Sequence, residues 1–441
     1  MLPVVLERYL AGRLPSPSGP RRLVVMTGAR QVGKTTLARH LYGGELRYLN
    51  LDSPGERERV RGVPAEGWAK AVGPAVLDEA QKAPAVFEKL KWAYDEGQLD
   101  FSVLLGSSRI LLLDRIRESL AGRVFLYEMW PLTVGELTPA YGGALPREPW
   151  ILRLATGSEP LGEILEPLLG GIVGSEAGAA QTAMHHVLEW GGLPSLLRYP
   201  PEDRLPWLDA YQATYLERDL GDLAQLRNLD AFTACHRLAA HRAGRILSFS
   251  ELARDAALPV TTTRRYLRYL ELSYQTFRLG AWARGAGTRW IKAPKLIWFD
   301  LGVQRTLSGQ LAGLSGEQYE SAIIAQILIT LWSLGARFTP SYLRTAGGLE
   351  IDLLLESQDR VLALEIKSRS TVSGRDATPF TRARHHLGER LAGGLVVHRG
   401  QQVVELAESV FAIPDWVLLG LGAEAPADRG SSRSRSEPDV E

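Results

Sequence analysis

The sequence has 441 residues, and 45% of them are hydrophobic, so the chain can form about two to four domains with buried cores and is not a disordered protein. Its single cysteine, Cys235, excludes a disulfide framework and a multi-cysteine metal site, and the lack of a secretory leader predicts a cytoplasmic protein. No apolar run approaches the roughly 18 residues of a membrane span. The best candidate, residues 323–334, is interrupted by Gln326 and Ser333, so we expect no membrane partner.

The formal net charge of +1 is unevenly distributed along the chain. Between Cys235 and Lys295 there are twelve Arg and Lys residues against three Asp and Glu residues. The rest of the chain is therefore acidic. One strongly basic module in an otherwise neutral chain is typical of a nucleic-acid contact.

Strands and helices are expected to alternate in the first part of the chain. A short helix over residues 1–12 and a loop over 14–20 come first. Apolar strands then fall at 23–27, 46–51, 75–77 and 101–105, with helices starting at 34 and over 86–97 between them. This alternation predicts an α/β fold with a parallel sheet and right-handed crossovers.

Composition suggests how the remaining residues are divided. Residues 140–180 are rich in Gly, Pro and small side chains, which is typical of a connector. We expect a core over 1–140, a linker and helical connector over 141–234, a basic module over 235–315, a compact α/β domain over 316–418 and a disordered tail over 419–441.

A phosphate-binding loop follows the first strand. The segment Gly28-Ala29-Arg30-Gln31-Val32-Gly33-Lys34-Thr35-Thr36 fits the pattern G-x-x-x-x-G-K-[ST] at every fixed position. It lies between a strand and a helix, where backbone N–H groups and the helix dipole face phosphate oxygens. We expect Lys34 to reach the β- and γ-phosphates of ATP and Thr35 to ligate Mg²⁺. The alternative, a chance match in a glycine-rich turn, does not explain this context.

The second half of a nucleotide site is expected in residues 75–81, an apolar strand that ends in two carboxylates. Asp78 is expected to hold Mg²⁺, and Glu79 to orient and deprotonate the attacking water. Either acid alone would also fit a strand that meets a charged helix cap. Following a P-loop at this distance, the pair predicts an ATPase.

Weaker candidates surround this site. The strand 101–105 should lie beside the P-loop strand, so Ser107 or Ser108 is a candidate sensor of the γ-phosphate, with helix capping as the open alternative. Arg30 and Arg123 are candidates for stabilising transition-state charge, from the same or a neighbouring subunit. Solvated arginines are the simpler interpretation of both.

Further short motifs run through the chain. They are Leu77-Asp78-Glu79-Ala80-Gln81, Gly106-Ser107-Ser108, Ser119-Leu120-Ala121-Gly122-Arg123, Trp130-Pro131-Leu132-Thr133, Gly191-Gly192-Leu193-Pro194, Tyr211 to Leu220, Asp300-Leu301-Gly302 and Gly348 to Asp352. With the P-loop, they resemble the prokaryotic AAA-type P-loop ATPases that carry a C-terminal domain of unknown function. The resemblance implies ATP binding, an AAA-like core, a winged helix and a nuclease-like C-terminal fold. Because AAA-like cores often work as rings, a homo-oligomer is a further expectation.

The basic module has the pattern of a helix-turn-helix. A first helix over 247–253 with Ser250 as its N-cap, a turn at 257–260 and a second helix over 261–270 are expected. Arg264, Arg265 and Arg268 should face outward from the second helix. A wing over 277–299 carries the basic residues Arg278, Arg284, Arg289, Lys292 and Lys295. This charge favours DNA binding through phosphates. The alternative is a lid over the nucleotide, with the arginines used in packing.

Four charged residues of the last domain resemble the D…E-x-K site of restriction-type nucleases, the PD-(D/E)xK fold. Asp352 lies in one apolar strand, Glu365 and Lys367 share a face of the next strand, and Glu320 opens a long helix. In such a site the carboxylates hold Mg²⁺ and the lysine polarises the attacking water. The alternative is a binding scaffold without catalysis, in which Lys367 neutralises Glu365 and Asp352.

Two interpretations of the whole chain stay open. The first is an Mg²⁺-dependent ATPase coupled to DNA binding and extending to DNA cleavage. The second is a nucleotide-controlled switch that binds a protein partner and uses the nuclease-like domain as a scaffold. The basic module and the four charged residues favour the first, and the lack of an assignable arginine finger favours the second.

Overall fold

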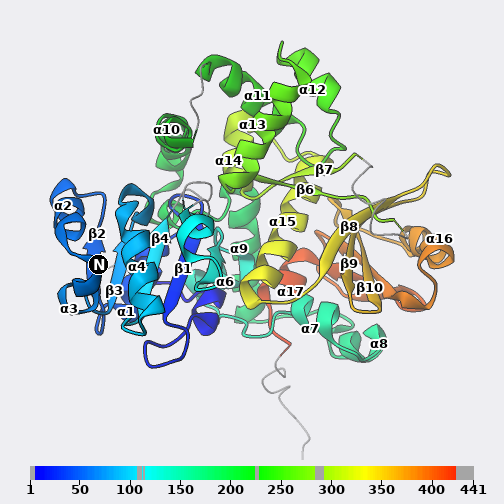
Figure 1. Ribbon diagram of the computed structural model, residues 1–441. Coiled ribbons are helices and arrows are strands. Elements are labelled where there is room, and N and C mark those ends of the chain that lie inside the picture. Colours follow the sequence, from blue (N-terminus) through cyan, green and yellow to red (C-terminus); the bar gives the residue numbers. More distant parts are fainter. Residues whose placement is uncertain (1–4, 107–111, 113–114, 224–227, 284–292, 424–441) are drawn as a thin grey trace, which may run out of the picture.

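A computed structural model describes residues 5–106, 112, 115–223, 228–283 and 293–423. It contains two larger β-sheets with a group of helices between them (Figure 1). The N-terminal sheet and its helices lie on one side, and the C-terminal sheet lies on the other. No helix in the described part of the chain is long and apolar enough to cross a membrane.

The first sheet has five parallel strands in the order β2-β3-β4-β1-β5, which confirms the predicted parallel α/β core. Its strands are β1 (Leu23–Gly28), β2 (Arg47–Asn50), β3 (Ala75–Asp78), β4 (Ser102–Gly106) and β5 (Phe125–Met129). The helices α1 (Lys34–Tyr42), α2 (Pro54–Gly62), α3 (Trp68–Ala71) and α4 (Ala85–Asp95) connect the first four strands. All carboxyl ends therefore meet at one edge, where ligands bind in open parallel sheets.

Alternate residues of these strands supply two separate apolar layers. Leu23 and Val25 of β1 pack in a cluster with the side chains of α4, whereas Val24 and Met26 join the large central cluster of the molecule. The continuous apolar runs in the sequence arise because the sheet is covered on both faces.

The segment after β5 lies partly in the centre of the molecule and partly beside the C-terminal sheet (Figure 1). Its helices are α6 (Val134–Leu137), α7 (Trp150–Thr156), α8 (Leu161–Leu165) and α9 (Ser175–Trp190). Backbone bridges join Pro149 to Gly422 and Leu169 to Val403, so this expected connector also lies against the C-terminal domain. One apolar cluster runs from Leu10 to Ala423 and is shared by all parts of the chain.

A helical region and a two-stranded hairpin follow. They comprise α10 (Pro201–Leu223), α11 (Leu229–His241), α12 (Phe249–Asp255), α13 (Val260–Leu272), β6 (Thr276–Leu279), β7 (Lys295–Trp298) and α14 (Leu301–Ser308). The hairpin is antiparallel. The predicted N-cap of α12 is wrong by two residues, because the Ser248 side chain, not Ser250, accepts the N–H of Glu251. Arg284, Arg289 and Lys292 lie outside the described residues.

The second sheet has six strands in the order β12-β13-β11-β10-β9-β8. They are β8 (Thr339–Arg344), β9 (Glu350–Ser357), β10 (Arg360–Lys367), β11 (Leu391–His398), β12 (Val404–Ala407) and β13 (Val410–Pro414). Strands β10, β11 and β13 run parallel and the other pairs are antiparallel. The helices of this part are α15 (Gly316–Leu334), α16 (Thr378–Leu387) and α17 (Asp415–Gly420), and α15 is buried along most of its length.

The expected helix over residues 1–12 is wrong in the part that the structure describes. Residues 5–8 are not helical, and only a 3-10 helix over Tyr9–Arg13 follows. The backbone of Arg8 is extended, and its guanidinium donates to the carbonyls of Val32 and Trp130 at 2.8 and 2.6 Å. These tertiary contacts outweigh the weak helical pattern of the segment.

Candidate functional site

The P-loop lies at the carboxyl end of β1, in close contact with β5. A side-chain carbon at Gly28 would lie 2.1 Å from the carbonyl oxygen of Met129, so only glycine fits there. Gly33 has a φ of 99° immediately before α1, and Gln31 has a φ of 64°. A left-handed non-glycine residue is strained and is typical of a ligand loop. The backbone therefore forms the turn that exposes N–H groups at the start of α1.

Lys34 is buried at this turn. Its ammonium donates to the carbonyls of Gly28 and Ala29 at 2.8 and 2.7 Å. These two neutral acceptors hold the positive charge of the Lys34 ammonium within the loop. An anionic phosphate in the loop would meet both this charge and the start of α1.

Asp78 ends β3 and faces the P-loop. Its Oδ2 accepts hydrogen bonds from the hydroxyls of Thr35 and Tyr48 at 2.7 and 2.6 Å, and its Oδ1 accepts the N–H of Glu79 at 2.9 Å. A hydroxyl and a carboxylate in contact are the oxygen ligands that Mg²⁺ uses beside a P-loop, so this pair fits the metal. Burial, and then the bond to Asp78, raise the pKa of Tyr48 to about 12, which keeps it a hydrogen-bond donor.

Glu79 and Gln81 lie beside Asp78. Glu79 has a φ of 54°, a strained value for a glutamate, and its Oε2 accepts the Gln81 side-chain amide at 2.5 Å. A side-chain carbon at Gly106 would lie 2.7 Å from Gln81 Oε1, so Gln81 reaches the end of β4. β4 pairs with both β1 and β3. The candidate sensors Ser107 and Ser108 follow β4 directly and lie outside the described residues.

The two candidate arginines are differently placed. Arg30 is part of the P-loop and is half-buried. Arg123 precedes β5, at the opposite edge of the sheet from the loop, and makes a two-pronged ion pair with Asp95 at 2.6 and 2.9 Å. Within one chain, Arg123 is therefore far from the phosphate end of the sheet.

Three residues that the sequence did not indicate support the P-loop from outside the core. Arg8 holds the carbonyl of Val32, Ser195 donates to Gln31 at 3.3 Å, and Tyr274 donates to Thr27 at 3.3 Å. Arg8 is itself paired with buried Glu136 at 3.1 Å. Isolated polar residues in loops carry no sequence signal for such contacts. The loop is thus contacted by the N-terminal segment and the connector, and the strand before it by Tyr274, which follows α13.

Two of the short motifs, Gly191-Gly192-Leu193-Pro194 and Asp300-Leu301-Gly302, contact each other at a glycine junction. Asp300 caps α14 through Val303 N–H at 3.0 Å and also accepts Gly192 N–H at 2.7 Å. A side-chain carbon at Gly302 would lie 1.9 Å from the carbonyl oxygen of Trp190. Burial raises the pKa of Asp300 to about 6. Close backbone approach explains why glycine is required there.

The C-terminal carboxylates converge, but around a lysine. The ammonium of Lys295, on β7, lies 2.7 Å from Glu320, 3.0 Å from Glu350 and 3.4 Å from Asp352. Lys295 was predicted as one of the basic residues of the wing, and it is 2% exposed. It lies inward because the start of β7 faces three carboxylates of the C-terminal domain.

Glu365 and Lys367 face the same cluster. Lys367 donates to Glu365 Oε2 at 2.7 Å, while Asp352 Oδ2 accepts the N–H of Ile366 at 2.9 Å. Burial, and then the charge of Asp352, raise the pKa values of Glu320 and Glu365 above their usual range. Within the described ranges, no three His, Cys, Asp or Glu side chains are arranged to hold a metal ion. The expected residues Glu320, Asp352 and Glu365 therefore share one cluster with Lys295 and Lys367.

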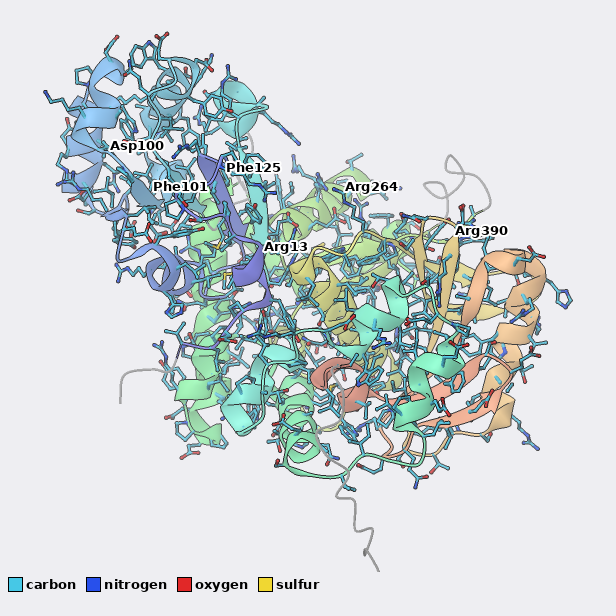
Figure 2. The ribbon with its side chains drawn as sticks, turned by 90° about the horizontal axis from the view of Figure 1, so that it is seen from below. Arg13, Asp100, Phe101, Phe125, Arg264 and Arg390 are labelled. Carbon is cyan, nitrogen blue, oxygen red and sulfur yellow. The ribbon has the colours of Figure 1, made fainter. Side chains whose placement is uncertain are left out.

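The basic module faces a cleft of about 1320 Å³ between β5, α12, α13, β6 and the end of α15. The arginines that line it are Arg13, Arg264, Arg268, Arg278 and Arg337, of which Arg13 and Arg264 are labelled in Figure 2. Arg264 stacks on Phe249, with its guanidinium carbon 4.0 Å from the ring centroid. Arg268 and Arg278 both pair with Glu271. Arg265 is exposed on α13. Glu271 thus neutralises part of the positive charge of the cleft.

The strand–loop–helix turn, with a carboxylate of the next strand but one on its threonine, has the geometry of a P-loop. Residues 20–138 match a family model described as an AAA domain. Residues 181–314 and 315–417 match two models described as domains of unknown function (DUF8612 and DUF4143).

Similar proteins are found over most of the chain. Uncharacterized proteins of Mycobacterium tuberculosis and Mycobacterium bovis are each 28% identical over 428 residues, which cover 95% of this chain and 86% of theirs. Among solved structures, a Walker-type ATPase of Pyrococcus abyssi is similar with a TM-score of 0.42 and 15% identity, covering 69% of this chain and 96% of that chain.

Proposed function

We propose that this protein is an Mg²⁺-dependent ATPase whose nucleotide state controls DNA binding. The observation that carries the proposal is the contact between Thr35 of the P-loop and Asp78 of β3, at 2.7 Å. A lone P-loop pattern would support only phosphate binding. A hydroxyl and a carboxylate held together beside the loop also supply what Mg²⁺-ATP needs.

Each residue of the site has a role in this proposal. The N–H groups of the loop and the Lys34 ammonium bind the β- and γ-phosphates. Thr35 and Asp78 would hold Mg²⁺, which supplies charge neutralisation on the transferred phosphoryl group. Glu79 orients the attacking water and accepts its proton, and the bond from Gln81 fixes the direction of its carboxylate.

We assign DNA binding to the basic cleft beside α13. Helices α11 to α13 with the β6–β7 hairpin have the element order of a winged helix, and Arg264 and Arg268 extend from the second helix of the pair. Phosphate contacts by such arginines would make the affinity fall as salt rises. The link to ATP is Tyr274, which follows α13 and contacts Thr27 next to the P-loop.

A second candidate function is a nucleotide-controlled switch that binds a protein partner. Two observations favour it: Glu271 neutralises two arginines of the cleft, and Lys295 lies among the carboxylates of the nuclease-like cluster. The position of Lys295 among these carboxylates also argues against DNA cleavage. Self-association remains compatible with both functions.

Phosphate release from ATP, measured with and without plasmid DNA, tests the proposal. We compare the wild type with Lys34→Ala, and with Arg264→Glu, which reverses a charge in the cleft. A Lys34-dependent rate that DNA raises, and that Arg264→Glu makes insensitive to DNA, supports the coupled ATPase. A Lys34-dependent rate that ignores DNA favours the protein switch, and a rate that survives Lys34→Ala contradicts ATP hydrolysis at this loop.

A further inference from the structure

The nuclease-like cluster is formed by Glu320, Glu350, Asp352, Glu365, Lys367 and Lys295. Of these, Lys295 comes from a different part of the chain. Lys295 begins β7, whereas Glu320 begins the C-terminal part on α15 and Asp352 lies on β9. The backbone around Lys295 is fixed on both sides, because Leu247 N–H donates to Pro294 at 2.8 Å and Leu296 N–H donates to Arg245 at 3.0 Å. The backbone of Lys295 is thus held by the segment 245–247, which precedes α12, and the lysine is not a surface side chain that folds inward.

Three of the four carboxylate oxygens of Asp352 and Glu365 are already engaged. One oxygen of Asp352 faces Lys295 and the other accepts the N–H of Ile366. One oxygen of Glu365 accepts Lys367, and its other oxygen is buried without a hydrogen-bond partner. A metal at the usual position between Asp352 and Glu365 would lie close to the Lys295 ammonium, and two positive charges at that distance in a buried site repel strongly.

The negative charges of the carboxylates explain why the cluster must contain a cation. Among the described residues, four carboxylates, Glu320, Glu350, Asp352 and Glu365, share the cluster with two lysines, Lys295 and Lys367. Burying carboxylates without a counter-charge is unfavourable, and removing one partner of a buried ion pair leaves an uncompensated charge. The cluster therefore needs either an ammonium or a metal ion near Asp352.

We infer that Lys295 is the resident cation of this cluster and takes the place of the divalent metal. The nuclease-like domain then serves as an ionic clasp that fixes the β6–β7 hairpin to the C-terminal sheet. It is not a hydrolytic centre. This inference goes beyond the proposed ATPase and does not depend on it, because it concerns a separate set of residues.

Mn²⁺ binding without nucleotide, followed by the electron paramagnetic resonance of free Mn²⁺, tests this. All proteins carry Asp78→Asn, which removes a metal ligand of the nucleotide site. With Lys295 present we expect no Mn²⁺ site that depends on Asp352. Lys295→Met should gain one Mn²⁺ site, with an affinity at least tenfold higher than any Mn²⁺ binding by the protein that keeps Lys295. Adding Asp352→Asn should abolish this site. Lys295→Arg keeps the positive charge and should gain none.

Each other outcome overturns the inference. Asp352-dependent Mn²⁺ binding in the presence of Lys295 would mean that metal displaces the lysine. A folded Lys295→Met protein that gains no site would mean that the cluster requires no cation. If Lys295→Met does not fold without metal, refolding in Mn²⁺ is measured by circular dichroism. Recovery that depends on Asp352 supports the inference, and no recovery contradicts it. Since no assay contains ATP, failure here leaves the proposed ATPase untouched.

Discussion

Two lysines among the described residues are buried, at two different sites, and their contacts differ. Lys34 contacts carbonyl oxygens of its own loop, at Gly28 and Ala29. Lys295 contacts three carboxylates from elements that lie outside its own hairpin. Both sites also contain acidic residues and both resemble metal-dependent catalytic sites.

This difference determines what each site can bind. Lys34 donates to two neutral carbonyls at the phosphate-binding turn, and the acid nearby, Asp78, accepts the Thr35 hydroxyl, which can share a metal with it. A lysine paired with carboxylates has its charge used within the protein, and it opposes a second cation. Acidic residues at matching spacing are therefore insufficient to define a metal site. The position of the nearest ammonium must be known as well.

The largest effect that we expect is on catalysis at the first site. Lys34→Ala should lower the rate of ATP hydrolysis at least about a thousandfold, or roughly 4 kcal/mol of transition-state stabilisation, because one preorganised charge on the transferred phosphoryl group is lost. Steady-state phosphate release measures this. The exposed Lys70→Ala is the matched control and should hydrolyse ATP at the wild-type rate. Equal rates for both variants would contradict the comparison.

At the second site, replacing the buried lysine Lys295 should affect the stability of the fold. Lys295→Met should lower the free energy of unfolding by about 3 kcal/mol, because it leaves buried carboxylates uncompensated. Urea unfolding followed by tryptophan fluorescence measures this at pH 8. Lys295→Arg is expected to recover most of the loss. If Lys295→Met were as stable as the wild type, Lys295 would not be an essential counter-charge.

The contact between Thr35 and Asp78 follows from the sequence because the signals for both residues are local. The P-loop pattern, the strand before it and the acids at the end of β3 lie within short segments, and the parallel sheet then brings the carboxyl ends of β1 and β3 to the same edge. Tyr48 could have been found as well, since it lies on a strand adjacent to β3 and is opposite Val76 in register. Arg8, Ser195 and Tyr274 could not, because their partners are remote in the chain and no pattern marks them.

The second site shows the limit of such patterns. Glu320, Asp352, Glu365 and Lys367 were identified from spacing alone, and the structure brings them to one cluster. The spacing of one domain carries no information about a side chain from another. Lys295 was counted with the basic residues of the wing because its neighbours in sequence are basic. Only the packing of β7 against α15 and β9 turns it inward.

A smaller effect should distinguish the role of Tyr48 at the first site. Tyr48→Phe removes one of two hydroxyls on Asp78 Oδ2, which should cost about 1.5 kcal/mol and raise the half-saturating Mg²⁺ concentration roughly tenfold. The rate at saturating Mg²⁺ should change little, because Tyr48 positions Asp78 and contacts no phosphate. Tyr94→Phe, an exposed tyrosine, is the control. A lower maximal rate with unchanged Mg²⁺ dependence would assign Tyr48 a different role.

The smallest expected effect concerns Asp300, at the junction between the connector and α14. Its pKa is raised to about 6 in the folded protein from an ordinary value of 3.8, so the folded state retains a proton that the unfolded state has lost. Stability from this group is therefore greatest at low pH and falls as pH rises towards 6, with a slope of at most about 1.4 kcal/mol per unit.

Between pH 5 and 6.5 the wild type should lose about 1 kcal/mol of unfolding free energy relative to Asp300→Asn, which does not titrate. The exposed Asp359→Asn should follow the wild type at every pH. Urea unfolding at several pH values measures the difference between the curves. Asp300 lies on the segment that continues from β7, so the same titration in a Lys295→Met background shows whether the clasp and the junction act together. Parallel curves for the two backgrounds would mean that the cluster at Lys295 and the glycine junction near the P-loop are energetically independent.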